Sequence, residues 1–157
     1  MESGGSILKN EAEMRYIVYA KGGSSMVSGK GAAAYIVTDD MNNVVEKNVF
    51  LCHGETVNRA QLRAMIAGFT HVPKDATNIR LVSDSDYVIN TLEGLWARNA
   101  NRELFRCWER LACEREGVIY EFKKMGDKVP EEHIENCKEM CNAWAGTELF
   151  AGYRSYK

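Results

Sequence analysis

The stretch RYIVYAKGGSS, residues 15–25, combines a strand pattern with a turn signal. Its first six residues are mostly aromatic or β-branched, which favours a strand, and the run KGGSS after them is typical of a turn. Two more β-rich runs follow at residues 32–38 and 44–52, and the Asp and Asn residues between them indicate a hairpin. This part of the chain therefore predicts three consecutive antiparallel strands.

The remainder of the sequence alternates helical and β patterns. Thr56 is expected to cap a helix that ends before Pro73, because apolar residues recur there at helical spacing. A strand is expected at 79–83, followed by a helix at about 86–96 and a second helix that carries Leu104, Trp108, Leu111 and Ala112. A strand at 118–122 then precedes a final helix that carries Ile134, Cys137, Cys141 and Trp144. The order βββαβααβα predicts a mixed sheet with helices packed on it.

Composition sets the class of protein. The chain has 157 residues, of which 45% are hydrophobic and 27% are charged, as in an ordinary globular domain. We expect one domain at 13–146 between tails at 1–12 and 147–157, with neither a secretory signal nor a run of about 18 apolar residues that would cross a membrane. The net charge of -2 argues against a strongly basic nucleic-acid binder, although a local basic patch stays compatible with it.

The five cysteines point to a reducing compartment rather than to disulfides or a metal site. They are odd in number and scattered, and only Cys137 and Cys141 lie four residues apart, as ligands on one helix face would. Because these two fall on an apolar stripe, we expect buried thiols. A cytoplasmic, reducing location follows from this pattern.

Four segments resemble the motifs of type 1 ribonuclease H, in the family's order and on the expected elements. YAKGGSS (19–25) is similar to YTDGGS, TVNRAQLRAMIAG (56–68) to TNNRAELMA, LVSDSDYVIN (81–90) to STDSQYV, and HIENCKEMCNAWA (133–145) to ENERCDELA. Together they cover about residues 15–145. The resemblance implies a ribonuclease H-like α/β fold, with a five-stranded sheet of three antiparallel and then two parallel strands and helices on both faces.

The same resemblance implies a reaction and the residues that would carry it out. Members of this family cut the RNA strand of RNA–DNA hybrids with two divalent metals, which four carboxylates hold. Carried over motif by motif, the first aspartate is replaced by Lys21, the glutamate by Gln61 and the last aspartate by Lys138, and only Asp84 is retained. A histidine in the loop before the last helix falls on Lys128, or on Asp127 after a shift of one residue.

Charge decides what these replacements mean. Lys21, Lys138 and Asp84 sum to +1 before any metal arrives, and each ammonium at about 4 Å opposes a cation by roughly 4 kcal/mol at an effective dielectric of 20. The nearby acids Asp39, Asp40, Glu55 and Asp86 are interpreted as turn, helix-end or surface residues. We therefore expect no metal and no other cofactor, with magnesium or manganese needed only if the chain is an active ribonuclease H after all.

Two interpretations of the lysines remain open. They either neutralise Asp84 as a structural cluster, or Lys21, Lys128 and Lys138 form a groove for a phosphate. The resemblance also implies backbone contacts to nucleic acid at Gly22, Gly23, Ser24, Thr56, Asn58 and Arg59, although Val57 replaces a family asparagine, and the segment 91–105 lacks the basic protrusion of some members.

The leading hypothesis is a catalytically inactive ribonuclease H-fold protein that binds nucleic acid, such as an RNA–DNA hybrid, or serves as an interaction domain. One alternative is an active ribonuclease H. Another is a decoy or regulator that binds a protein partner through the former active-site face. A membrane partner is not expected.

Overall fold

The computed structural model of the chain describes residues 13–125 and 131–150. Its elements in chain order are β1 (Arg15–Ser24), β2 (Gly31–Asp39), β3 (Val44–Leu51), α2 (Val57–Thr70), β4 (Asn78–Ser83), α3 (Asp86–Glu93), α4 (Arg102–Cys113), β5 (Ile119–Lys124) and α5 (Glu132–Ala145). This order confirms the predicted βββαβααβα arrangement.

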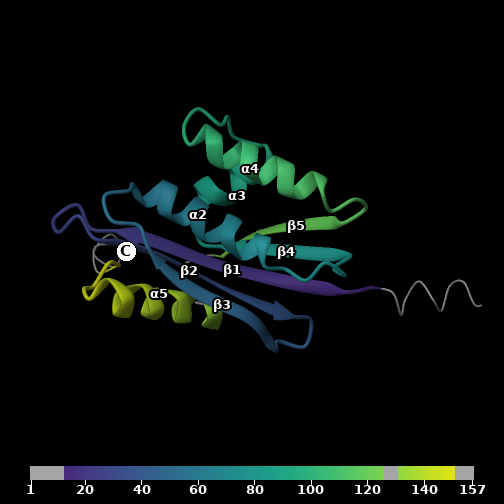
Figure 1. Ribbon diagram of the computed structural model, residues 1–157, viewed down its shortest axis with the longest axis horizontal. Coiled ribbons are helices and arrows are strands. Elements are labelled where there is room, and N and C mark those ends of the chain that lie inside the picture. The colour runs from purple at the N-terminus through teal and green to yellow at the C-terminus, as the bar shows by residue number, and fades with distance from the viewer. Residues whose placement is uncertain (1–12, 126–130, 151–157) are drawn as a thin grey trace, which may run out of the picture.

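The five strands form one mixed sheet in the order β3-β2-β1-β4-β5 (Figure 1). The strand β2 pairs antiparallel with both β1 and β3, whereas β4 pairs parallel with both β1 and β5. The predicted sheet of three antiparallel and then two parallel strands is therefore confirmed.

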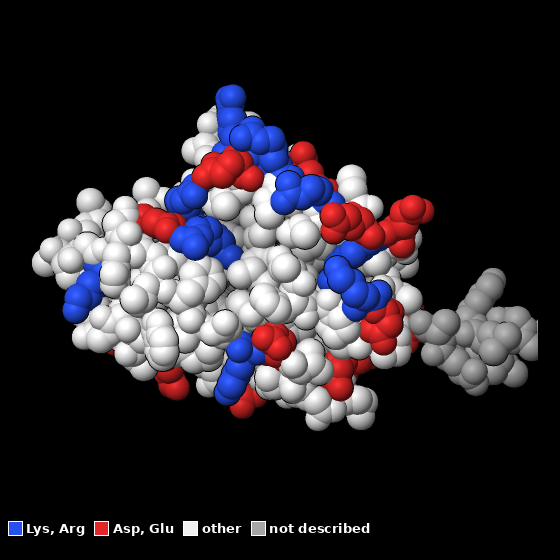
Figure 2. All heavy atoms as spheres, in the orientation of Figure 1, with Lys and Arg blue, Asp and Glu red and all other residues white. Residues whose placement is uncertain are grey.

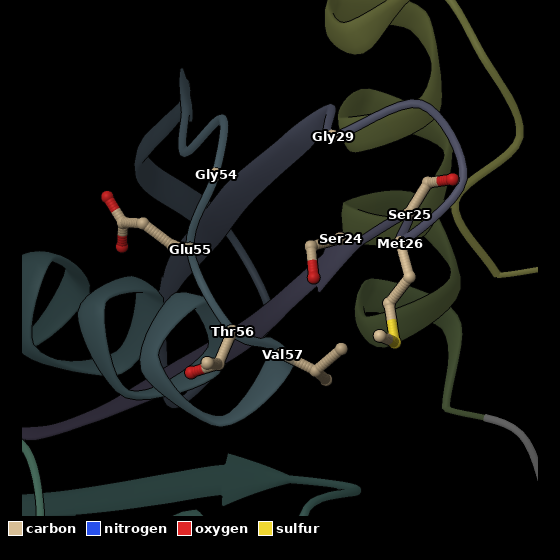
Figure 3. Close-up of a pocket in the computed structure, with 8 residues that line it drawn as sticks. All are labelled: Ser24, Ser25, Met26, Gly29, Gly54, Glu55, Thr56 and Val57. Carbon is tan, nitrogen blue, oxygen red and sulfur yellow. The ribbon is translucent and has the colours of Figure 1, made fainter.

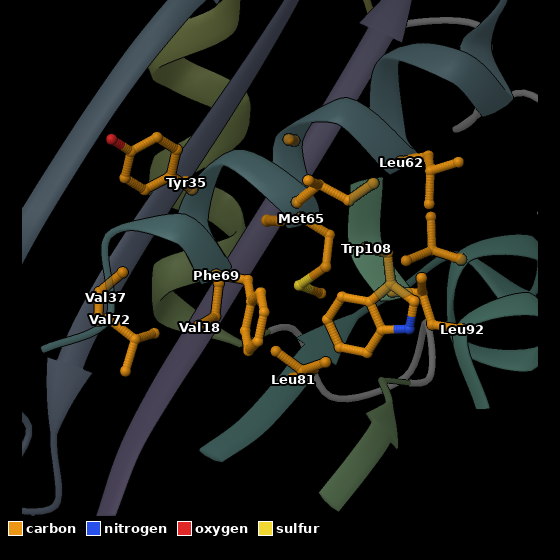
Figure 4. Packing of buried hydrophobic residues seen from close by; sticks show 14 of the residues in the cluster. Val18, Tyr35, Val37, Leu62, Met65, Phe69, Val72, Leu81, Leu92 and Trp108 are labelled. Carbon is orange, nitrogen blue, oxygen red and sulfur yellow. The ribbon is translucent and has the colours of Figure 1, made fainter. Parts of the chain in front are cut away.

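Helices cover both faces of the sheet, as predicted. The helices α2, α3 and α4 lie on one face and α5 lies alone on the other (Figure 1). The larger core joins Val18 of β1 to Leu62, Met65 and Phe69 of α2 and to Trp108 of α4 (Figure 4). A second, smaller core lies under α5, and no helix of the described residues is long and apolar enough to cross a membrane.

The expected turn at residues 21–25 is wrong, because β1 continues to Ser24 and the turn lies at residues 26–28. Packing on both faces of the strand explains the difference. A Cβ atom on Gly22 would lie 2.5 Å from the backbone carbonyl of Ala60 in α2, and one on Gly23 would lie 2.5 Å from the ring of Phe150. The two glycines therefore serve close packing of a strand, which local turn statistics do not reveal.

Two other boundaries differ from the prediction. The helix expected to reach residue 96 ends at Glu93, because Gly94 takes the left-handed conformation (φ 90°) and its N–H bonds to Asn90 and Thr91 carbonyl oxygens. The folded domain also extends past residue 146, since Leu149 and Phe150 are buried in the core under α5.

Candidate functional site

The centre of the candidate site is an ion pair between Lys21 of β1 and Asp84, which follows β4. The parallel register places Tyr19 opposite Val82, so the residues two positions further along each strand face each other. The Lys21 Nζ atom lies 2.9 Å from the Asp84 Oδ1 atom. Only 3% of the Lys21 side chain and 17% of the Asp84 side chain are exposed, so the pair is largely withdrawn from water.

Local structure holds Asp84 in this position. It stands between the last residue of β4 and Ser85, whose side chain caps α3 by accepting a hydrogen bond from the Val88 N–H. The Ser85 N–H in turn donates to the Ser83 hydroxyl oxygen at 3.0 Å. The carboxylate is thus carried by a strand–helix junction that is fixed on both sides.

Opposing effects act on the Lys21 ammonium. Burial lowers its pKa, the adjacent Asp84 carboxylate acts in the opposite direction, and the charge of Lys138 lowers it further. The Nζ atom also lies 5.3 Å from the centre of the Phe150 ring, which suits a cation–π contact. A buried pair of this kind is weak support for added stability, because desolvation offsets much of the attraction.

Lys138 approaches the pair from α5, but its own ion pair is with Glu135 at 3.0 Å, one helical turn away. Two thiols fix α5 against β1 near this point. Cys137 Sγ donates to the Tyr19 carbonyl oxygen at 3.8 Å, and Cys141 Sγ donates to the Lys21 carbonyl oxygen at 3.5 Å. The predicted burial of both thiols is confirmed, and it raises the pKa of Cys141 to about 12.

Gln61, which stands where the family motif has its glutamate, lies in α2. Its backbone nitrogen lies next to Gly22, the neighbour of Lys21 in β1, and its side chain is 5% exposed. The Gln61 Oε1 atom has no hydrogen-bond partner in the described parts of the chain. The structure therefore brings Lys21 and Asp84 together, with Lys138 near them, and places the Gln61 backbone beside Gly22. Lys128 and Asp127 lie outside the described residues.

The residues at this place do not fit a two-metal centre. They offer one carboxylate, one amide and two ammonium groups, and hard cations such as magnesium prefer oxygen ligands with carboxylates among them. Across residues 13–125 and 131–150, no three His, Cys, Asp or Glu side chains are grouped so as to hold a metal.

The other acids near these motifs have partners elsewhere. Asp39 accepts hydrogen bonds from the Met41 and Asn43 N–H groups in the β2–β3 turn. Glu55 pairs with Arg59 and Arg63. The Asp86 Oδ1 atom lies 3.6 Å from the Lys124 Nζ atom. These contacts agree with the turn, helix-end and surface roles expected from the sequence.

The residues expected near nucleic acid divide into three groups. Gly22 and Gly23 are buried against α2 and Phe150, as described above. Arg59 bonds to Glu103 at 2.7 Å, to Glu55 at 3.4 Å and to the Asn101 side chain at 3.2 Å, so it joins α2 to the start of α4. Asn58 is exposed. Ser24 and Thr56 line a cleft at the end of β1, the strand that carries Lys21.

This cleft has a volume of about 380 Å³ and opens between the β1–β2 turn and the start of α2 (Figure 3). Its lining residues are Ser24, Ser25, Met26, Gly29, Gly54, Glu55, Thr56 and Val57. The Thr56 hydroxyl caps α2 by accepting from the Arg59 N–H at 3.2 Å, as predicted for this residue.

Sequence reasoning missed most of the cleft. Gly29 (φ 73°) and Gly54 (φ 79°) both take the left-handed conformation, and the Gly54 N–H donates to the Gly29 carbonyl oxygen at 2.8 Å. This bond joins the loop after β1 to the loop after β3 and forms one wall of the cleft. The signal in the sequence was an isolated glycine in each of two loops, which is too common to indicate that the loops meet.

Fold and site together define a class of protein, an α/β domain with a mixed five-stranded sheet and a buried ion pair where its parallel strands β1 and β4 lie side by side. A model of the RNase H family matches residues 13–140, and the chain belongs to this family. No curated protein matches it.

Solved structures share the fold at low identity. The N-terminal RNase H domain of a Mycobacterium tuberculosis protein, solved as a fusion with maltose binding protein, is 21% identical with a TM-score of 0.67, over 82% of this chain and 97% of the other. RNase H1 from the halophilic archaeon Halobacterium salinarum is 23% identical with a TM-score of 0.62, over 82% and 95%. LC11-RNase H1 in complex with an RNA/DNA hybrid is 16% identical with a TM-score of 0.65, over 82% and 94%.

Proposed function

We propose that the chain is an RNase H-fold domain that binds nucleic acid at the cleft beside β1 without cleaving it by two-metal hydrolysis. The observation that carries the proposal is the buried ion pair between Lys21 and Asp84, whose atoms lie 2.9 Å apart. The motif resemblance assigns both residues to positions of the family's metal ligands.

The loss of hydrolysis follows from charge. The family's reaction needs metals to activate water and to stabilise the leaving oxygen. Here Asp84 already has a cationic partner, and Lys138 adds a second positive charge close enough to lower the pKa of Lys21. A divalent cation at Asp84 would have to displace the Lys21 ammonium. That largely buried ammonium would then lose its carboxylate partner.

Binding of nucleic acid is supported by the family and by the shape of the surface. One solved relative, LC11-RNase H1, is complexed with an RNA/DNA hybrid. In this chain a cleft with hydroxyl groups from Ser24, Ser25 and Thr56 remains open next to the altered centre. Hydroxyl groups and backbone N–H groups are common partners of phosphate oxygens. Lys21 itself acts as a structural residue in this proposal, because it is 3% exposed and bonded to Asp84.

A protein partner at the same face is the second candidate. It is favoured by Met26 and Val27 at the tip of the β1–β2 turn, whose side chains are 98% and 99% exposed beside the cleft. Exposed apolar groups of this kind mark interaction sites when they form part of a larger surface.

One titration separates these functions. Labelled RNA–DNA hybrid is mixed with increasing protein in magnesium and then in manganese, and both the mobility and the length of the RNA strand are followed. We expect a mobility shift with intact RNA. A shortened RNA strand would instead support an active ribonuclease H, and intact RNA without any shift would favour the protein partner.

A further inference from the structure

A row of arginines on α4 lies outside the altered centre. Arg102, Arg106 and Arg110 follow one another at intervals of four residues, and all three are exposed. Residues four apart lie on the same side of a helix, about 6 Å apart along its axis. We call these three residues the α4 ridge.

The acids on the same helix do not neutralise the α4 ridge, because they have other partners. Glu103 bonds to Arg59 of α2 at 2.7 Å, and Glu109 bonds to Arg98. The Arg59 hydrogen bond is also the largest cause that lowers the pKa of Glu103, and Arg106 contributes less. Within the described residues, no carboxylate forms an ion pair with any of the three ridge arginines. The Arg110 guanidinium donates to the Cys107 sulfur at 3.9 Å.

The start of α4 is linked to the cleft wall through Arg59 of α2. Glu103, the neighbour of Arg102, is tied to Arg59, and the Arg59 N–H donates to Thr56 in the cleft wall. From there α4 leads away over the face of the molecule that α2 also covers (Figure 1). Figure 2 shows basic side chains along this upper edge, over α4, with acidic groups between them.

We infer that Arg102, Arg106 and Arg110 bind the phosphate backbone of nucleic acid that continues past the cleft, an inference that rests on the proposed function. Guanidinium groups suit this ligand, because they stay charged and donate paired hydrogen bonds to phosphate oxygens. A nucleic acid explains why three cations in a row lack an acidic partner on a chain whose net charge is -2. The contacts are to backbone only, so the ridge adds affinity without sequence preference.

The test compares the full chain with a triple variant, Arg102→Gln, Arg106→Gln and Arg110→Gln. Binding of a labelled RNA–DNA hybrid and of a labelled single strand is measured over a series of potassium chloride concentrations. Each neutralised phosphate contributes about 0.7 to 0.9 to the slope of log affinity against log salt, so the triple variant should lose about 2 to 3 from that slope. Its affinity at low salt should fall by roughly tenfold or more for all sequences alike.

A matched control removes the same charge elsewhere. Lys47, Lys74 and Lys123 are exposed lysines on β3, on the α2–β4 loop and on β5, and their replacement by Gln should leave the salt slope within error of the parent. Thermal melts of both triple variants establish that they are folded.

The outcomes distinguish this inference from the proposed function. If the parent binds and the α4 ridge variant keeps its affinity and slope, the inference is overturned while the proposed function stands. If the lysine control loses as much affinity and slope as the α4 ridge variant, the inference is also overturned, because the effect would then be general charge attraction. If the parent binds neither hybrid nor single strand, the proposed function fails first, and binding to poly-aspartate instead would assign the ridge to an acidic protein.

Discussion

Lys21 is held by two features that come from distant parts of the chain. The register of β1 against β4 places Asp84 opposite it, and Phe150 lies over it from the end of the domain. That Lys21, Gln61 and Lys138 stand where the family motifs have acids could be read from the sequence, because the rest of each motif resembles the family's. The burial of Lys21 could not be predicted, since it depends on strand register and on Phe150, a residue that the sequence assigned to a tail.

Replacing Lys21 with Met should destabilise the protein by about 3 kcal/mol, because removing one partner leaves a largely buried carboxylate uncompensated. Lys138→Met is the control, and it should cost less than about 1 kcal/mol because its pair with Glu135 is partly exposed. Urea unfolding at neutral pH measures both. Equal costs for the two variants would mean that the Lys21–Asp84 pair has no special role.

At the scale of elements, β1 shows where local sequence signals mislead. The run KGGSS is typical of a turn, but Gly22 and Gly23 lie within a strand between α2 and Phe150. The number and order of the elements were predictable, because apolar periodicity is a local property. The packing of β1 on both faces is a tertiary property and overrides the preference of glycine for turns.

Gly22→Ala should be much more harmful than Gly29→Ala. The added Cβ at position 22 would meet the Ala60 backbone at 2.5 Å, which helix α2 cannot relieve by a rotamer change, so we expect a loss of about 3 kcal/mol. At position 29 nothing lies within 4 Å of the new atom, and only the positive φ is strained, at a cost of about 1 kcal/mol. Similar midpoints of urea unfolding for the two variants would contradict the packing described for β1.

The contact between α5 and β1 predicts how stability depends on alkaline pH. Burial raises the pKa of both Cys137 and Cys141 above the ordinary 9.0, to about 12 for Cys141. The unfolded chain then loses these protons above pH 9 while the folded chain keeps them, so stability falls as pH rises.

From pH 9 to pH 10 these two thiols should together remove about 2 kcal/mol from the free energy of unfolding. The variant Cys137→Ala with Cys141→Ala should lack this part of the decline. Cys113→Ala is the matched control, because Cys113 is exposed, and its decline should equal that of the parent. A double variant that declines as steeply as the parent would show that the two thiols do not cause the loss.

The sheet order and the distribution of helices followed from the sequence and its family motifs. The end of the domain did not, because Leu149 and Phe150 are an adjacent apolar pair beyond the last helix, in a stretch without helical or strand periodicity. The cleft was also hidden, since it arises where two loops separated by β2 and β3 meet.

We propose that Lys21, Gln61 and Lys138 occupy the positions of a former metal centre around Asp84. The triple variant Lys21→Asp, Gln61→Glu and Lys138→Asp changes the formal charge of the four positions from +1 to -4. Without metal it should be less stable than the parent, because four carboxylates repel one another. Stability is a better readout than cleavage of hybrid, because Val57 still stands where the family has an asparagine and should keep cleavage slow.

The most direct measurement is a thermal melt of the parent and of this triple variant, each with and without magnesium. A metal at 100 times its Kd adds about 2.7 kcal/mol to the native state, which corresponds to a rise of about 5 to 10 °C in Tm for a chain of this size. We expect that rise in the triple variant and no change in the parent. A triple variant that melts identically with and without magnesium, or a parent whose Tm rises with it, would contradict the account.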